Sequence, residues 1–241
     1  MISYKVGNSY LDRFKDTCHL QDIDCSISHQ QRAVEWTSSG YANLPSYLNN
    51  LGKSYLGHCK QSCDPQDIDC AISHSKRAAE STPAGHANFP SYLRNLVNSY
   101  LCHFQHSGNL QDLEQVISCY QRAVESALCS DANLPRYFNN LGNFYFLHFK
   151  CTSNLQDIDN AISYYQRAVE STPLGHAGHP GWLNNIGTLY FRHFEHTGSI
   201  QDIDHAISHF QRSVESTPIG HANLQSWLNN LGGTGLLLWH K

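Results

Sequence analysis

The chain has 241 residues, a formal net charge of −4 and only 15% charged residues, against roughly 25% in an average soluble domain. No Lys/Arg cluster marks a nucleic-acid-binding face, and no apolar run approaches the roughly 20 residues that cross a bilayer. The start, Met1-Ile2-Ser3-Tyr4-Lys5, lacks the order of a signal peptide. We therefore expect a cytoplasmic protein with no nucleic-acid or membrane partner. The 9 cysteines, an odd number without a CxxC pair, are expected to be free thiols.

One segment recurs along the chain at a constant interval. QDIDCSIS begins at residue 21, and related segments begin at residues 66, 111, 156 and 201, so that every interval is 45 residues. Residues 1–20 are interpreted as a partial first helix that precedes the first copy. Five copies without insertion or deletion predict a single stacked array over residues 1–241, not a series of unrelated domains.

Each copy begins with a pattern typical of an amphipathic helix. In the fourth copy, apolar side chains recur at spacings of three and four, which predicts one buried stripe. The stripe consists of Ile158, Ala161, Ile162, Tyr165, Ala168 and Val169. Asp157 and Asp159 lie in the first turn, where acids complement the helix dipole. Proline then ends the helix, as at Pro83, Pro173 and Pro218.

A different helical pattern follows a short polar loop in each copy. It opens with a proline, which is well tolerated in a first turn, and it ends before a glycine such as Gly108 or Gly198. The prolines are Pro45, Pro90, Pro135 and Pro180. Two such helices joined by a short loop pack antiparallel. The predicted fold is therefore all-α, built of antiparallel helix pairs, with residues 224–241 as a final, divergent helix.

These residues resemble the tetratricopeptide repeat. The first-helix pattern of that motif matches Leu48, Leu51, Gly52 and Tyr55, and the second-helix pattern matches Ala161, Tyr165, Ala168 and Pro173. The resemblance implies a right-handed superhelical solenoid with a concave face. Departures are the period, 45 residues against a usual length of roughly 34, Val97 at a Gly position, and Leu128 at a Pro position.

The long period resembles kinesin-light-chain repeats and, more closely, long arrays of mushroom-forming fungi. Those arrays often precede a caspase-like CHAT protease domain, which this chain does not contain. The resemblance implies a protein- or peptide-binding scaffold. The alternative is a sensor or regulatory fragment of a larger protein with such an effector.

In tetratricopeptide proteins, first helices line the concave groove, and residues beside the Leu-Gly step commonly point into it. The resemblance places a ladder of mostly Asn side chains there. Its members are Asn49, Asn50, Lys53, Arg94, Asn95, Asn98, Asn139, Asn140, Asn143, Asn184, Asn185, Asn229 and Asn230. Two interpretations stay open: the amides bind a peptide backbone, or they bridge neighbouring helices. A carboxylate clamp would also need Lys or Arg, for which Lys53, Arg94, Arg136 and Arg192 are the candidates.

Histidine and cysteine raise the question of metal binding. His58, His103, His148 and His193 recur at the end of the first helix of each copy, and His205/His209 are spaced i, i+4. Such pairs hold a metal only with further ligands, and the dipole at a helix end also favours His. Cys59, Cys63 and Cys70 are expected around one inter-helix loop. We expect no metal, no cofactor and no enzymatic activity, because an active site is singular whereas nearly everything in this chain is repeated. Self-association is an open alternative, because neither end carries a distinct polar cap.

Overall fold

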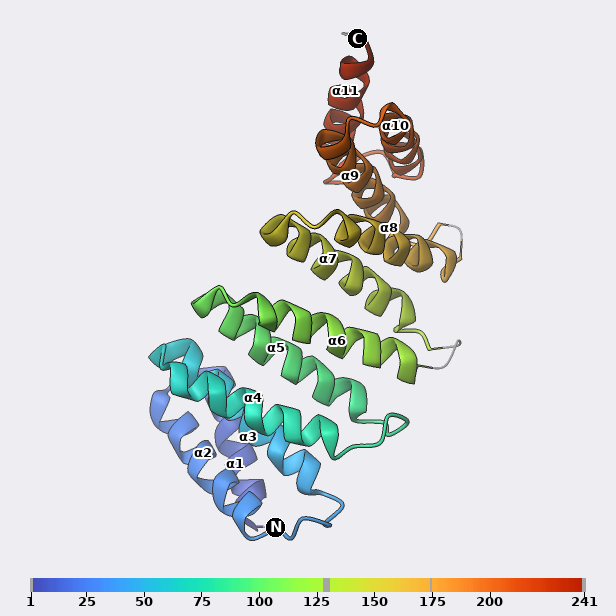
Figure 1. The fold of residues 1–241 in the computed structure, drawn as a ribbon. Helices are drawn as coiled ribbons and strands as arrows, with labels where there is room; N and C mark the ends of the chain where they lie inside the picture. Colours follow the sequence, from blue (N-terminus) through green and yellow to red (C-terminus); the bar gives the residue numbers. More distant parts are fainter. Residues whose placement is uncertain (1, 128–130, 174, 240–241) are drawn as a thin grey trace. The chain divides into compact units, whose positions relative to one another are not determined.

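The computed structural model describes residues 2–127, 131–173 and 175–239, the last four of them by their backbone alone. Over these residues the chain forms α-helices and no strand (Figure 1). The helices are α1 (Ile2–Thr17), α2 (Leu20–Glu35), α3 (Leu44–Ser62), α4 (Pro65–Glu80), α5 (Phe89–Ser107), α6 (Leu110–Ser126), α7 (Leu134–Thr152), α8 (Leu155–Glu170), α9 (His179–Thr197), α10 (Ile200–Glu215) and α11 (Leu224–Trp239). None of the described helices is both long and apolar enough to span a membrane.

The chain divides into two units, Met1–Ser126 and Ala127–Lys241. The first contains α1 to α6 and the second α7 to α11 (Figure 1). Within each unit, every helix packs against the next one along the chain. This arrangement confirms the predicted all-helical fold of helix pairs. The expected single solenoid over residues 1–241 stays a prediction.

The first helix of each pair ends at a residue in the left-handed backbone conformation. Gly108 and Gly198 occupy this position after α5 and α9, with φ of 67° and 72°, as the sequence predicted. After α3 and α7 the same position is held by Cys63 and Ser153, with φ of 56° and 57°. Side chains disfavour this conformation, so these two helix ends are less favourable than the glycine ends.

The second helix of each pair begins one residue before the boundary expected from the repeat, at residues 20, 65, 110, 155 and 200. Asp64 and Asn154 cap α4 and α8, accepting hydrogen bonds from the backbone N–H of Gln66 and Gln156. A side-chain oxygen at this position satisfies one of the backbone donors that a helix start leaves unpaired. The polar residue before the repeat segment is thus a helix start signal.

A close contact within the pairs α7–α8 and α9–α10 explains the Leu-Gly step of the first helix there. A Cβ on Gly142 would lie 2.9 Å from the ring of Tyr165, and one on Gly187 would lie 2.8 Å from the ring of Phe210. Both aromatic side chains are almost fully buried. Glycine is therefore required where a large ring of the second helix lies against the backbone of the first.

The departure at Val97 has a structural counterpart in the partner helix. Val97 is buried, and Tyr120, which corresponds to Tyr165 one repeat later, is only half-buried. We infer that the valine side chain occupies space that the aromatic ring of Tyr165 or Phe210 fills in the pairs α7–α8 and α9–α10. The other departure, Leu128, and the side chains of the apolar tail at 236–239 lie outside the described residues.

Candidate functional site

The predicted groove residues differ in exposure. Asn49 and Asn95 are buried. The half-buried members are Asn50, Lys53, Asn139, Asn140, Asn184, Asn185 and Asn230, and the exposed members are Arg94, Asn98, Asn143 and Asn229. All lie on first helices of the pairs or on α11, as the resemblance implies. The set therefore includes both core-facing and solvent-facing amides.

Amides of neighbouring first helices bond to one another. Asn95 Nδ2 donates to Asn49 Oδ1 over 2.6 Å, and Asn230 Nδ2 donates to Asn184 Oδ1 over 3.0 Å. Both bonds join positions 46 residues apart, so each links one helix pair to the next. The bridging interpretation of the Asn ladder is therefore supported for these four residues.

Further amides of the ladder are also engaged. Asn50 Nδ2 donates to Asn8 Oδ1 over 3.0 Å, and Asn139 Nδ2 donates to Asn140 Oδ1 over 3.3 Å. Tyr165 donates its hydroxyl hydrogen to Asn143 Oδ1 over 2.7 Å. Burial raises the pKa of that tyrosine, so its hydroxyl stays protonated as a donor. These bonds hold the amides in fixed orientations.

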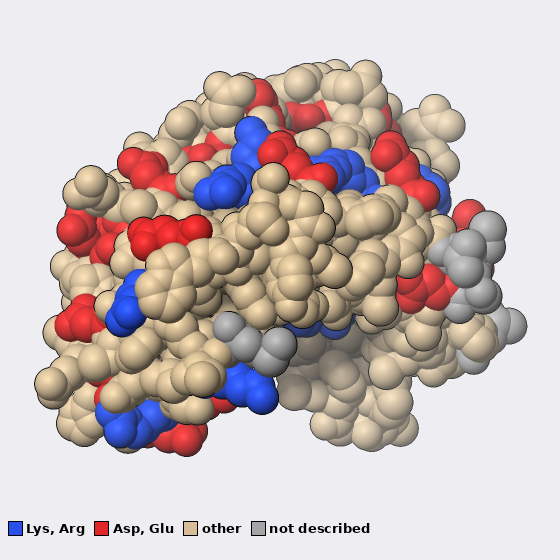
Figure 2. Space-filling model, turned by 90° about the horizontal axis from the view of Figure 1, so that it is seen from below, with Lys and Arg blue, Asp and Glu red and all other residues tan. Residues whose placement is uncertain are grey.

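Lys53 on α3 lies within electrostatic reach of Lys15, Arg94 and Asp12, all in the first unit. The pKa of Lys53 is lowered first by burial and then by the charges of Lys15 and Arg94. Lys15 pairs with Asp12 over 2.7 Å, whereas neither Lys53 nor Arg94 forms an ion pair within the described residues. On the face that Figure 2 shows, Lys and Arg lie in small groups among Asp and Glu.

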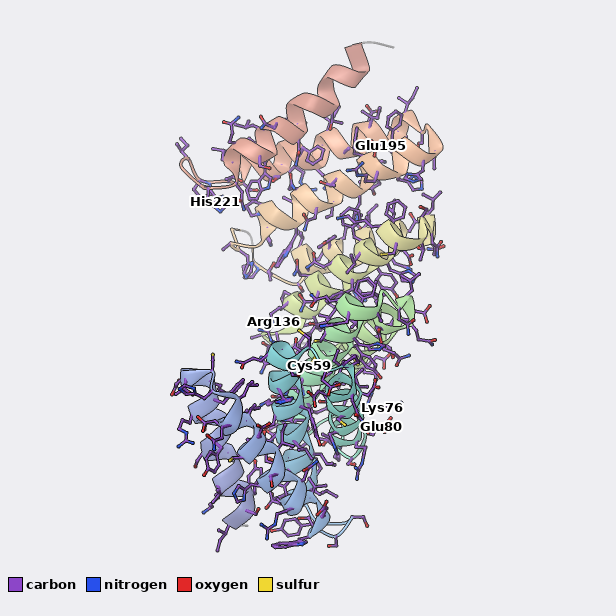
Figure 3. The ribbon with its side chains drawn as sticks, turned by 90° about the vertical axis from the view of Figure 1, so that its left-hand side faces the viewer. Cys59, Lys76, Glu80, Arg136, Glu195 and His221 are labelled. Carbon is purple, nitrogen blue, oxygen red and sulfur yellow. The ribbon has the colours of Figure 1, made fainter. Side chains whose placement is uncertain are left out.

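The two other clamp candidates have different surroundings. Arg192 donates to Glu195 over 2.7 Å at the exposed end of α9. Arg136 lies in the first turn of α7 (Figure 3) and lines a cavity of 610 Å³ together with Trp182. They are not brought together with each other, so the second unit offers no counterpart of the Lys53–Arg94 pair.

Cavities of similar lining occur at the loop end of the pairs in both units. The cavity of 610 Å³ in the second unit is lined by Pro135, Thr172 and Trp182, among others. A cavity of 460 Å³ in the first unit is lined by Pro45, Thr82 and Tyr92, which are the residues two repeat lengths earlier. His176 stacks on Trp182 with ring centroids 5.2 Å apart. These cavities offer aromatic and hydroxyl groups at a repeated place.

The recurring histidines form hydrogen bonds to aspartates that sequence reasoning missed. Each donates from Nδ1 to an aspartate in the first turn of the following helix. The Nδ1–Oδ2 distances are 2.5 Å for His58–Asp67, 2.6 Å for His103–Asp112, 2.8 Å for His148–Asp157 and 2.7 Å for His193–Asp202. Because a carboxylate only accepts hydrogen bonds, each bond fixes which ring nitrogen carries the proton. These side chains have a structural role, and the signal was the constant nine-residue spacing.

The first pair of helices carries the same interaction with another cation. Arg13, one repeat length before His58, pairs with Asp22. His58 additionally faces Asp24 through Nε2, 3.3 Å away. A positive or proton-donating side chain at the end of the first helix is thus the common feature of all five pairs.

The candidate metal-binding residues of the described part of the chain are His and Cys side chains. Among the described residues, no group of three or more His, Cys, Asp or Glu side chains is arranged to hold a metal ion. His205 and His209 instead pack against the ring of Tyr190. Cys70 lies near Tyr55, and Cys102, not Cys70, lies beside Cys59.

Comparisons with known proteins identify a similar repeat in part of the chain. Residues 151–173 match the tetratricopeptide repeat family model. No curated protein sequence matches the chain.

Solved structures resemble the chain over most of its length. The MamA RS-1 ArsTM double mutant has a TM-score of 0.54 at 14% identity, covering 89% of this chain and 94% of that chain. BtubC (BKLC) from P. vanneervenii has a TM-score of 0.53 at 19% identity, covering 90% and 84%. A Podosopora anserina putative kinesin light chain with nearly identical TPR-like repeats has a TM-score of 0.52 at 8% identity, covering 88% and 94%. Likeness at such low identity concerns the fold alone, and the chain has the helical-repeat fold of tetratricopeptide proteins.

Proposed function

We propose that the chain is a binding scaffold that holds a peptide or a segment of another protein on its first helices, and that it has no enzymatic activity. Tetratricopeptide proteins commonly serve as interaction scaffolds. The described first helices carry exposed Asn side chains next to Asn side chains that are held by hydrogen bonds. The observation that carries the proposal is the Asn95–Asn49 hydrogen bond of 2.6 Å between α5 and α3, because Arg94 precedes Asn95 and Lys53 lies one turn after Asn49 on these neighbouring helices. Two cations without an ion pair offer a place for an acidic group of a partner.

The chemistry around these cations favours a carboxylate in an extended segment. Arg binds carboxylates through two parallel N–H donors, and such charge-assisted bonds are stronger than neutral ones. Asn98 lies one turn after Arg94 on α5 and is exposed, so that its amide is accessible to a peptide backbone. The bridged amides Asn49 and Asn95 lie on the same helices and keep the face rigid, which lowers the entropic cost of binding.

The compartment that we propose is the cytoplasm. The eight described cysteines are free, which suits a reducing compartment. The alternative function, a sensor fragment of a larger protein with a CHAT-type effector, has no particular support from the geometry and stays a prediction. Self-association through the ends likewise stays a prediction.

A peptide-display selection tests the proposal directly. The full chain is used to select binders from a library of random peptides, and the selected peptides are expected to carry Asp, Glu or a free C-terminal carboxylate. Their binding should weaken as the salt concentration rises, because exposed charges are screened. Selection of no binder, or of binders without an acidic group, would contradict the proposed carboxylate recognition.

A further inference from the structure

Three cysteines and one histidine gather at one corner of the first unit. We call this the thiol corner: Cys59 and Cys63 at the end of α3, and Cys102 and His106 at the end of α5. Figure 3 shows Cys59 on its helix. The backbone N–H of Cys63 donates to Cys59 O over 2.8 Å. Cys102 Sγ lies 3.9 Å from His106 Nδ1.

Cys59 departs from the repeat in a way that the other pairs do not share. The equivalent positions, 45 residues apart, hold Phe14, Phe104, Phe149 and Phe194. In the second unit, Phe149 at this place packs edge-on against His196 with ring centroids 5.2 Å apart and helps to line a cavity of 220 Å³. At the thiol corner a small sulfur-bearing side chain replaces the ring.

The two inner thiols of the corner are enclosed by apolar side chains. Cys59 is 0% exposed and Cys102 is 6% exposed, and both belong to one core cluster with Leu56, Ile68 and Ala71. Cys63 is exposed. His106 already uses Nδ1 in a hydrogen bond of 2.8 Å to Cys102 O. The inner pair is therefore shielded from water and has no other strong polar partner among the described residues.

The two inner thiols are direct neighbours within this buried cluster. Burial, and next the neighbouring Cys102 thiol, raise the pKa of Cys59 to about 12. Two thiolates in an apolar place repel each other and lose their hydration. A cation placed between the sulfurs would offset the repulsion between the thiolates and part of their lost hydration, because a metal-bound thiol is deprotonated outright.

We propose that Cys59 and Cys102 together bind one Cu(I) ion through their two sulfur atoms. Soft thiolate ligands select Cu(I) and Zn²⁺, but a structural Zn²⁺ site uses four ligands. No group of three or more ligating side chains converges among the described residues, and Cu(I) is stable with two thiolates in a linear arrangement. The number of ligands therefore favours Cu(I) over Zn²⁺.

Binding at this site involves no change of oxidation state. Cu(I) forms two Cu–S bonds, the two S–H bonds break, and both protons leave to solvent. The product carries one net negative charge. Because the two sulfurs belong to α3 and α5, the bound ion would join neighbouring helix pairs of the first unit.

Titration of the reduced full chain with Cu(I) under anaerobic conditions, in competition with bathocuproine disulfonate, tests this site. The chain carries no His tag. Cys59→Phe restores the residue of four other repeats, and Cys102→Ala removes the other thiol with little change in packing; circular dichroism verifies that both variants fold. The matched control is Cys25→Ser/Cys70→Ser, which removes two half-buried thiols at equivalent places of α2 and α4.

Wild type and the control variant are expected to retain one Cu(I) per chain against the competitor and to release two protons on binding. Each of the Cys59→Phe and Cys102→Ala variants should bind at least roughly a hundredfold more weakly, since losing a ligand costs more than losing an outer partner. Equal retention by wild type and either of these variants would overturn the proposal. So would a wild-type chain that yields all its Cu(I) to the competitor.

Discussion

The smallest recurring interaction in this chain is the bond between a histidine and an aspartate nine residues later. It connects the C-terminal part of the first helix with the first turn of the second helix in four of the five pairs. Asp157 and Asp112 are buried, so a lost partner would leave a carboxylate away from water. A buried carboxylate without a partner is costly, which explains why each copy keeps a donor at this position.

His148→Ala and Asp157→Ala should each lower the free energy of unfolding by about 1–3 kcal/mol, the usual worth of a hydrogen bond to a charged group. The double variant should lose less than the sum of the two, because both changes remove the same bond. Urea unfolding of the wild type, both single variants and the double variant measures this coupling. Strict additivity would show that the two side chains do not interact.

His209 gives the stability a dependence on pH. Its ring stacks on Tyr190 at 5.7 Å, and burial, followed by the charges of Arg212 and His205, lowers its pKa to about 4. As pH falls below about 6.5, His209 becomes protonated in the unfolded chain but stays neutral in the folded chain. The contribution of the neutral His209 to the free energy of unfolding is therefore complete above pH 6.5 and is lost as pH falls towards 4.

His209→Tyr should remove this part of the pH dependence. The substitution copies Tyr164, which stacks on Tyr145 at 5.6 Å one repeat earlier. Between pH 7 and 4.5, wild type should lose about 1 kcal/mol more than the variant, after allowance for the partial exposure of the ring. Unfolding curves at several pH values measure the difference, and parallel profiles for the two proteins would disprove the role of His209.

At the scale of the helix, close packing decides which residues the repeat tolerates. Gly142→Ala should destabilise the chain by about 1–3 kcal/mol, the usual cost of overpacking, because its Cβ would meet the ring of Tyr165 at 2.9 Å. Gly181→Ala is the matched control, since a Cβ there meets nothing within 4 Å. That control should gain about 1 kcal/mol from helix propensity. Thermal or urea unfolding of both variants provides the comparison, and equal gains would refute the packing argument.

The left-handed helix ends offer a stabilising substitution. Ser153 has φ of 57° after α7, where Gly198 stands after α9. Ser153→Gly should raise the free energy of unfolding by about 1 kcal/mol, because glycine adopts this conformation without the clash of a Cβ. Urea unfolding measures the gain. A loss of stability would mean that contacts of the serine side chain outweigh its backbone strain.

The sequence predicted the helices well because each helix carries its own signals. The apolar stripe of α8 is buried as expected except for the half-buried Val169, and proline, glycine and the capping residue set the helix ends. The site was harder to predict, because hydrogen bonds such as Asn95–Asn49 join residues 46 positions apart. Only the packing of one pair on the next shows which amides are used between helices. The His–Asp pairs have a constant nine-residue spacing that could have predicted them. The helix dipole already accounted for the histidine and for the aspartate separately, so a bond between the two was not expected.

At the scale of the molecule, repeated residues and residues that differ between copies have different roles. Residues that recur in most copies, such as the His–Asp pairs and the Gly step, hold the helix pairs together. Residues that differ between copies are free to recognise a partner, and Lys53 and Arg94 are of this kind: the corresponding positions elsewhere hold Asn, Thr or Gly for Lys53, and Asn or Tyr for Arg94. The proposed binding face is therefore located where the repeat is broken, not where it is kept.

The affinity of a selected acidic peptide is the most direct test of this account. Isothermal titration calorimetry compares wild type with Lys53→Glu/Arg94→Glu and with Lys76→Glu/Arg77→Glu, which makes the same change in charge on the exposed surface of α4. The first variant is expected to bind at least about tenfold more weakly, about 1.4 kcal/mol, and the second to bind like wild type. If both variants kept the wild-type affinity, or both lost it equally, the first-helix face would not be the binding surface.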